Sequence, residues 1–204
     1  MLATLTNQLR AGRPLTTDQI PAAVEALVAE AFPPEAKADF LIALADKGET
    51  PEEIAGFARE LRERATPLPV PPALRERGLL DVVGTGGDGL GTINLSTAAA
   101  LIAATAGVPV AKHGNRAVTS KSGSADVLEA LGIPIELEPD QAARILAGRG
   151  FVFLFAPRYH PAFKHIAPAR KLCAQRGRRT LFNFLGPLLN PARPTAQLMG
   201  VPRP

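Results

Sequence analysis

The spacing of apolar residues changes at a proline-rich stretch of this 204-residue chain, and that change most restricts the fold. Before the stretch, apolar residues recur at helical spacing. After it, short apolar runs alternate with helical segments, which predicts a parallel α/β sheet. We therefore expect an α/β protein with a small all-helical domain over residues 1–65, a stiff linker over 66–72 and a larger parallel-sheet α/β domain over 73–204.

The first domain is predicted to consist of short helices that need partners. One follows the apolar face of residues 20–31, and Thr17 is expected to cap it. A second begins at Pro34. A third begins with a capping box formed by Thr50 and Glu53. Helices this short and one-sided must bury their apolar faces, so we expect a helical bundle that can also serve as an oligomer surface.

The second domain is predicted to alternate strands and helices. The expected strands are 80–83, 108–111, 151–155 and 197–201, with extended chain at 133–137, and the expected helices are 97–106, 122–131, 140–147 and 161–176.

Composition excludes some classes of protein. The chain has no tryptophan and one tyrosine, which argues against a stacking platform for single-stranded nucleic acid, although the net charge is +4. A single cysteine, Cys173, rules out an internal disulfide and fits a reducing compartment. The first residues lack the pattern of a secretory signal, and no apolar run approaches the roughly 18 residues of a membrane span. We expect a cytoplasmic, soluble protein.

A glycine-rich turn over residues 84–89, GTGGDG, follows the first predicted strand. Glycines let backbone N–H groups approach an anion closely. A dinucleotide site would need an acidic residue about 20 positions later, and a P-loop would need Lys-Ser/Thr directly after Gly89; neither is present. No acidic residue occurs between Asp88 and Asp126, which favours an anionic ligand, while a purely structural turn stays open.

Two further segments carry chemistry. Residues 92–97 start a helix, where Ser96 or Thr97 can cap the helix or bind phosphate, and where hydroxyl and amide oxygens can serve magnesium. Residues 112–116, KHGNR, follow the second strand, at the sheet edge where open α/β sheets bind ligands. Their cations suit a diphosphate or a carboxylate, although a solvated basic loop is the alternative.

The histidines and Arg170 are less informative alone. His113 can be a packed or hydrogen-bonded histidine rather than a proton donor. His160 and His165 have no cysteine or carboxylate partner set, so no zinc site is expected. Arg170 lies on the segment 161–176, where a surface position is the simplest interpretation.

The motifs together carry a specific resemblance. GTGGDG (84–89), NLST (94–97), KHGNR (112–116), KSGSAD (121–126), HPAFKHIAPAR (160–170) and RTLFNFLGPLLNP (179–191), in this order, resemble the anthranilate phosphoribosyltransferase family. The resemblance implies a pentosyltransferase of tryptophan biosynthesis. Such an enzyme transfers the phosphoribosyl group of 5-phosphoribosyl 1-diphosphate to the amine of anthranilate, releasing diphosphate. It also implies Mg²⁺ and a homodimer formed through the helical domain.

The resemblance also implies site residues. Phosphoribosyl diphosphate is expected to contact Gly84, Gly87, Asp88, Thr92, Asn94, Leu95, Ser96, Thr97, Lys112, His113, Gly114, Asn115, Arg116, Ala117, Val118, Thr119, Ser120 and Ser124. Anthranilate is expected to contact Gly84, Asn115 and Arg170, and Ser96 is the expected magnesium ligand. His113 is expected to act by position rather than by titration.

The family's α/β domain extends beyond the point that corresponds to Pro204 and carries an adjacent Asp–Glu pair that binds magnesium. We therefore expect this α/β domain to be incomplete. Two rival functions stay open: a pyrimidine-nucleoside phosphorylase, which has a similar fold and glycine turn, and a non-catalytic relative that binds a ligand or nucleic acid.

Overall fold

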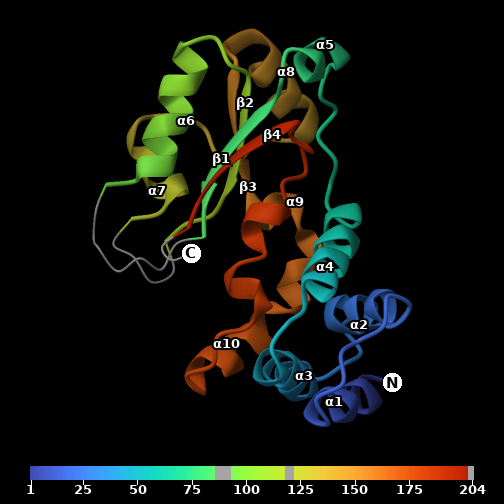
Figure 1. Cartoon of the computed structure of the whole chain (residues 1–204). Helices are drawn as coiled ribbons and strands as arrows, with labels where there is room; N and C mark the ends of the chain where they lie inside the picture. The colour runs from blue at the N-terminus through green and yellow to red at the C-terminus, as the bar shows by residue number, and fades with distance from the viewer. Residues whose placement is uncertain (86–92, 118–121, 202–204) are drawn as a thin grey trace. The chain divides into compact units, whose positions relative to one another are not determined.

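The computed structural model describes residues 1–85, 93–117 and 122–201 (Figure 1). The chain forms two compact units. The helical unit comprises Met1–Arg64 and His160–Leu189, and the α/β unit comprises Ala65–Tyr159 and Asn190–Pro204.

The helical unit begins with α1 (Leu2–Arg10), α2 (Gln19–Val28), α3 (Pro34–Lys47) and α4 (Pro51–Glu63). It continues with the 3₁₀ turn η1 (Pro161–His165), helix α10 (Ala167–Gln175) and the 3₁₀ turns η2 (Leu181–Asn183) and η3 (Gly186–Leu188). The predicted start of α3 and the capping box of α4 are confirmed. The predicted cap at Thr17 is wrong, because Asp18 occupies the N-cap of α2 and makes no side-chain cap bond.

One apolar core holds the helical unit together. Phe40 and Leu44 of α3 belong to the same cluster as Cys173 of α10 and Leu181 of η2. The α/β domain expected over 73–204 stays a prediction; within that range, residues 160–189 pack into the helical unit. Their apolar side chains are buried against the N-terminal helices, which hydropathy along the chain did not indicate.

The α/β unit contains a parallel sheet of four described strands in the order β3-β2-β1-β4 (Figure 1). Its elements are α5 (Pro72–Glu76), β1 (Leu80–Gly84), α6 (Leu95–Thr105), β2 (Val110–Gly114), α7 (Ser124–Ala130), α8 (Pro139–Arg149), β3 (Phe151–Phe155), α9 (Ala156–Tyr159) and β4 (Ala196–Gly200). Three strands lie within a residue or two of their predicted positions. The second ends three residues later than predicted, at Gly114.

Separate apolar clusters cover the two faces of the sheet. One combines Val110 and Phe153 with residues of α6 and α7. The other combines Ala111 and Leu154 with residues of α5 and α8. Alternation along each strand assigns successive side chains to opposite faces. The expected linker also belongs here, because Leu68 and Val70 are buried in the second cluster.

The described helices include none that combines the length and the apolar character of a membrane span.

Candidate functional site

The site is built around Lys112, a buried cation near the end of β2. Its side chain is 1% exposed. Its Nζ donates hydrogen bonds to the carbonyl oxygen of Val82 on β1 at 2.5 Å and to Oγ of Ser96 on α6 at 3.1 Å. Burial lowers the pKa of Lys112 to about 8, and the charge of Asp81 partly opposes that shift. The side chain thus brings positive charge to the start of α6.

Asp81, on β1, supplies the negative charge nearby and is fully buried. Its Oδ1 accepts a hydrogen bond from the backbone N–H of His113 at 3.3 Å, and its Oδ2 accepts one from Nε2 of Gln197 at 3.2 Å. Burial raises the pKa of Asp81, against hydrogen bonds from Asn190, Gln197 and His113. The carboxylate therefore joins β1, β2 and β4 just before the edge where the site lies.

The backbone of β2 separates the side chains of Lys112 and His113. Lys112 pairs in register with Phe153 of the cluster covered by α6 and α7. His113 pairs with Leu154 of the opposite cluster. Since successive strand residues face opposite ways, the imidazole, which is 4% exposed, lies on the face away from Ser96. The sequence placed both residues in one loop because it ended β2 too early.

The first turn of α6 provides polar groups next to Lys112. Asn94 is the N-cap, and Leu95, Ser96 and Thr97 follow it. Thr97 is 1% exposed, and its Oγ1 has no hydrogen-bond partner among the described residues. The helix dipole favours an anion at such a helix start. The lysine and the helix start together form a cradle suited to phosphate.

The segment after β2 is held to α7. Asn115 accepts a hydrogen bond at Oδ1 from the backbone N–H of Arg116 at 2.8 Å. Arg116 forms a bidentate ion pair with Glu129, and Ala117 donates its N–H to Asp126 at 3.0 Å. Gly114 is required at the strand end, because an added Cβ would lie 2.9 Å from the ring of Phe153.

The residues predicted to contact phosphoribosyl diphosphate fall into two groups, those that the structure describes and those that it does not. Gly84, Asn94–Thr97, Lys112–Ala117 and Ser124 all belong to the α/β unit. Gly87, Asp88, Thr92, Val118, Thr119 and Ser120 lie outside the described residues.

Arg170 belongs to the helical unit and lies on α10, with its guanidinium carbon 5.6 Å from the ring centre of Phe182. It is exposed, as expected of a surface residue.

Sequence reasoning missed Asn190. Its side chain is 3% exposed and donates from Nδ2 to the carbonyl oxygen of Ala111 at 2.8 Å. A polar residue inside the apolar stretch 181–191 was the available signal.

The described residues fit magnesium only together with an anion. Ser96 Oγ lies beside the ammonium of Lys112, which would repel a bare cation. No group of three histidine, cysteine or carboxylate side chains suited to a metal occurs in the described ranges. Mg²⁺ commonly keeps waters and binds through substrate phosphates, so a serine oxygen is an adequate partial ligand for a magnesium–diphosphate complex.

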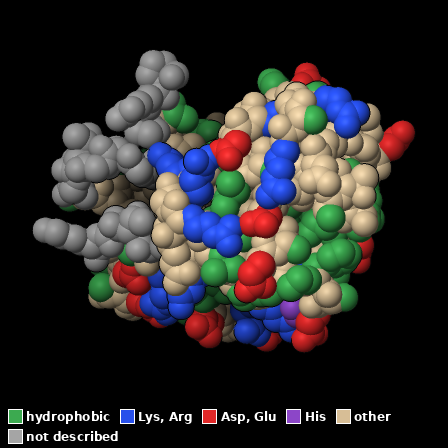
Figure 2. Space-filling model, turned by 90° about the horizontal axis from the view of Figure 1, so that it is seen from below, with side chains coloured by type: hydrophobic (Ala, Val, Ile, Leu, Met, Phe, Trp, Pro, Cys, Tyr) green, Lys and Arg blue, Asp and Glu red, His purple; other side chains and the backbone are tan. Residues whose placement is uncertain are grey.

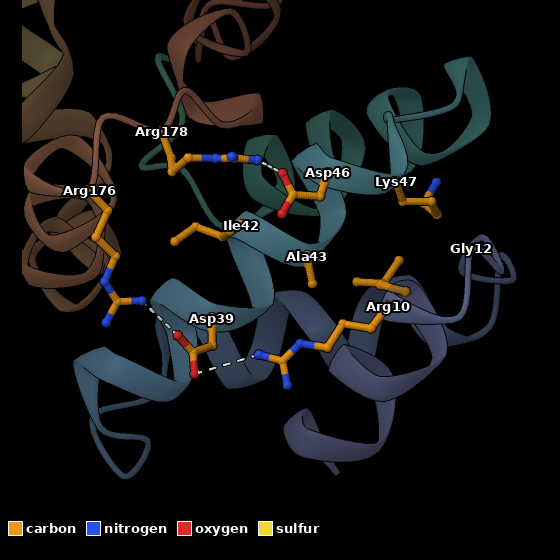
Figure 3. Close-up of a pocket in the computed structure, with 10 residues that line it drawn as sticks. Arg10, Gly12, Asp39, Ile42, Ala43, Asp46, Lys47, Arg176 and Arg178 are labelled. Carbon is orange, nitrogen blue, oxygen red and sulfur yellow. Dashed lines mark hydrogen bonds and ion pairs between the residues drawn. The ribbon is translucent and has the colours of Figure 1, made fainter.

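The helical unit carries a pocket of about 730 Å³ (Figure 3). Ile42 and Ala43 of α3 lie on its wall between charged side chains. Asp39 pairs with Arg176 at 2.8 Å, and Arg178 pairs with Asp46. On the face seen in Figure 2, Lys and Arg side chains (blue) and Asp and Glu side chains (red) lie next to one another.

Comparison with protein families decides the classification. The model of the glycosyl transferase family α/β domain matches residues 76–204, which is more than half of the chain. The model of the helical bundle domain of the same family matches residues 3–65. This chain belongs to the glycosyl transferase family. The observed arrangement of a helical bundle and a parallel-sheet α/β domain agrees with that membership.

Among curated relatives of this family member, the anthranilate phosphoribosyltransferase of Shewanella frigidimarina is 48% identical over 200 residues, covering 98% of this chain and 57% of the relative. The enzyme of the same name from Chlorobium phaeovibrioides is 52% identical over 196 residues, covering 96% of this chain and 54% of the relative. The chain thus spans little more than half the length of these relatives.

Solved structures agree. The crystal structure of anthranilate phosphoribosyltransferase from Thermus thermophilus matches with a TM-score of 0.86 at 49% identity, covering 97% of this chain and 58% of that protein. The Saccharomyces cerevisiae enzyme in complex with PRPP and Mg matches with a TM-score of 0.84 at 29% identity, covering 98% of this chain and 58% of that protein.

Proposed function

We propose that this chain belongs to an anthranilate phosphoribosyltransferase, which transfers phosphoribosyl from 5-phosphoribosyl 1-diphosphate to the amine of anthranilate in tryptophan biosynthesis. The observation that carries the proposal is the buried ammonium of Lys112 beside Ser96 at the start of α6. A cation and a helix N-terminus at one place favour a diphosphate. The relatives of the same name support the acceptor.

The chemistry requires charge stabilisation more than a nucleophile. As the bond from the anomeric carbon to the diphosphate breaks, the sugar gains positive charge and the leaving group gains negative charge. Lys112 and the positive end of the α6 dipole would stabilise the leaving diphosphate. Bound Mg²⁺ would neutralise further charge on that group, with Ser96 as one oxygen ligand. His113 would position the strand end through its backbone bond to Asp81.

The other predicted contacts form part of the same proposal. Gly84, Gly87, Asp88, Thr92, Asn94, Leu95, Thr97 and the segment Lys112–Ser120, with Ser124, would surround phosphoribosyl diphosphate. Gly84, Asn115 and Arg170 would hold anthranilate, because a planar guanidinium suits a carboxylate. A cytoplasmic location stays a prediction from the sequence.

A homodimer formed through the helical unit completes the proposal. Its support is the pocket between α1, α3 and the end of α10, where apolar side chains lie among paired charges. Such a mixture is typical of protein interfaces. Sedimentation of wild type and of an Ile42→Glu variant tests it: the wild type should be dimeric and the variant monomeric. A monomeric wild type would contradict the dimer.

Separate affinities test the function itself. Calorimetry with phosphoribosyl diphosphate and Mg²⁺, and with anthranilate, should show binding of both. Lys112→Ala should weaken only the first ligand and Arg170→Ala only the second. Equal effects of both variants on both ligands would contradict the assignment.

Rival functions have their own assays. Phosphorolysis of thymidine or uridine would favour a pyrimidine-nucleoside phosphorylase. Steeply salt-dependent binding of a polynucleotide would favour a nucleic-acid-binding relative.

A further inference from the structure

The contacts between the end of β2 and α7 converge on one carboxylate. Asp126, in the first turn of α7, accepts two backbone hydrogen bonds at the same oxygen, Oδ2. The donors are the N–H of Ala117 at 3.0 Å and the N–H of Gly123 at 2.7 Å. These donors stand before and after residues 118–121. One side chain therefore fixes the distance between the two ends of this segment.

Close packing at Gly123 shows how tightly those ends meet. A Cβ built on Gly123 would lie 2.3 Å from the backbone nitrogen of Ala117 and 2.6 Å from the carbonyl carbon of Arg116. Only glycine fits without moving the backbone. The carbonyl oxygen of Ser122 also accepts a hydrogen bond from Nδ2 of Asn94 at 3.1 Å, which connects these ends to the start of α6.

Arg116 belongs to the same set of contacts. Its Nη2 donates to Glu129 Oε1 at 2.8 Å, its Nη1 donates to Glu129 Oε2, and Nη1 lies 3.4 Å from Asp126 Oδ1. Its guanidinium carbon also lies 5.5 Å from the ring centre of Phe155. Two carboxylates and an aromatic face thus engage the guanidinium, and its charge is more than balanced locally.

Electrostatics explains why these carboxylates are tolerated beside an anion site. Hydrogen bonds from Ala117 and Gly123 stabilise the charged form of Asp126, so the pKa of its carboxyl lies below the ordinary range. The side chain of Arg116 neutralises part of the remaining charge. Asp126 therefore repels a nearby phosphate less than an unpaired carboxylate would, and it still holds the N–H groups of Ala117 and Gly123 in place.

We propose that Asp126 is a positioning residue for the phosphoribosyl-diphosphate site. It ties both ends of the segment 117–123 to the start of α7, and we call its hydrogen bonds with Ala117 and Gly123 the clamp. The side chain of Arg116 serves as the counter-ion of this clamp rather than as a phosphate ligand. The inference rests on the proposed function for the identity of the ligand. The side chain of Arg116 then makes no contact with the substrate.

Two measurements separate the clamp from the function. Amide hydrogen exchange without ligand reports the clamp directly. Exchange at Ala117 and Gly123 should speed up at least tenfold in Asp126→Ala and stay close to wild type in Asp126→Asn, whose single amide oxygen can accept both bonds. Asp140→Ala is the matched control, since Asp140 also stands in the first turn of a helix of this unit. It should leave both amides unchanged.

Calorimetry with phosphoribosyl diphosphate and Mg²⁺ reports the role in binding. Asp126→Ala should raise Kd at least tenfold, Asp126→Asn less than threefold and Asp140→Ala not at all, with circular dichroism unchanged. If wild type binds and Asp126→Ala binds equally well, the positioning role is overturned. If wild type does not bind, the proposed function fails, and the exchange data then show whether the clamp exists without it.

A double-mutant cycle decides the role of Arg116. If Arg116 acts only within the clamp, Arg116→Ala and Glu129→Ala should weaken binding by similar factors, and the double variant should bind like either single one. If Arg116 binds phosphate directly, Glu129→Ala should release it and leave affinity unchanged or tighter, while Arg116→Ala weakens it. That second pattern would overturn the assignment of Arg116.

Discussion

Replacing Lys112 by methionine should make the protein more stable and at the same time remove its affinity for the anion. Burial lowers the pKa of Lys112 from 10.5 to about 8. That difference corresponds to about 3 kcal/mol, since one pKa unit equals about 1.36 kcal/mol. The ammonium is still the main form at pH 7, so the folded state bears this cost. Methionine has a similar length and no charge.

The net gain should be smaller than that cost. The substitution also removes the hydrogen bonds to Val82 and Ser96, each contributing about 1 kcal/mol, whereas the attraction to Asp81 is already included in the pKa shift. We expect the free energy of unfolding of the α/β unit to rise by about 1–2 kcal/mol at pH 7. Urea unfolding, followed by circular dichroism, measures the change, and calorimetry with phosphoribosyl diphosphate measures the affinity.

Lys171→Met is the control, because Lys171 is exposed on α10 and its replacement should change stability by less than about 0.5 kcal/mol. If the free energy of unfolding of Lys112→Met fell by more than 1 kcal/mol, the argument that burying this charge costs stability would be refuted. Wild-type affinity in the same variant would refute its role in binding the anion.

Three other substitutions test the structure. Burial lowers the pKa of His160 to about 4, so a stabilisation of about 3 kcal/mol is present above pH 6.5 and is lost as the pH falls towards 4. In His160→Gln, the free energy of unfolding should therefore depend less on pH between 6.5 and 4 than in wild type. An equal pH dependence of both proteins would contradict this prediction. Glu53→Ala should cost about 3–5 kcal/mol in urea unfolding, because the buried Lys47 loses its partner at 2.6 Å; a cost below 1 kcal/mol would be inconsistent with the buried pair. Gly123→Ala should weaken binding of phosphoribosyl diphosphate at least tenfold in calorimetry, since Ala117 leaves no room for Cβ; unchanged affinity would show that the segment adapts.

Two local signals in the helical unit were reliable because a few neighbouring residues decide the structure there, although the cap predicted at Thr17 was not. The capping box of Thr50 and Glu53 forms because each side chain bonds to the other's backbone three positions away. Helix α3 begins at Pro34, where the missing N–H has no cost. The alternation of short apolar runs and helical segments indicated a parallel sheet, because the spacing of apolar residues within each segment can be read from the sequence alone.

The site could be predicted only as a set of motifs. The motifs GTGGDG, NLST and KHGNR pointed to the carboxyl edge of the sheet, and the described parts of NLST and KHGNR do meet there, through the bond between Lys112 and Ser96. The sequence could not tell that β2 extends to Gly114, and so it could not place His113 on the opposite face from Lys112. A shift of the strand end by a few residues decides which side chains face the ligand.

By itself, then, the sequence predicted most of the helices and strands, and it supplied the cation and hydroxyl groups on which the proposed anion site rests. The tertiary structure alone decided that residues 160–189 join the helical core, that Asp81 meets Gln197 across the sheet and that Glu129 engages Arg116. Local structure follows from bonds between residues a few positions apart. Burial, charge pairing and pKa shifts depend on which distant segments pack together, and packing exists only in the folded chain.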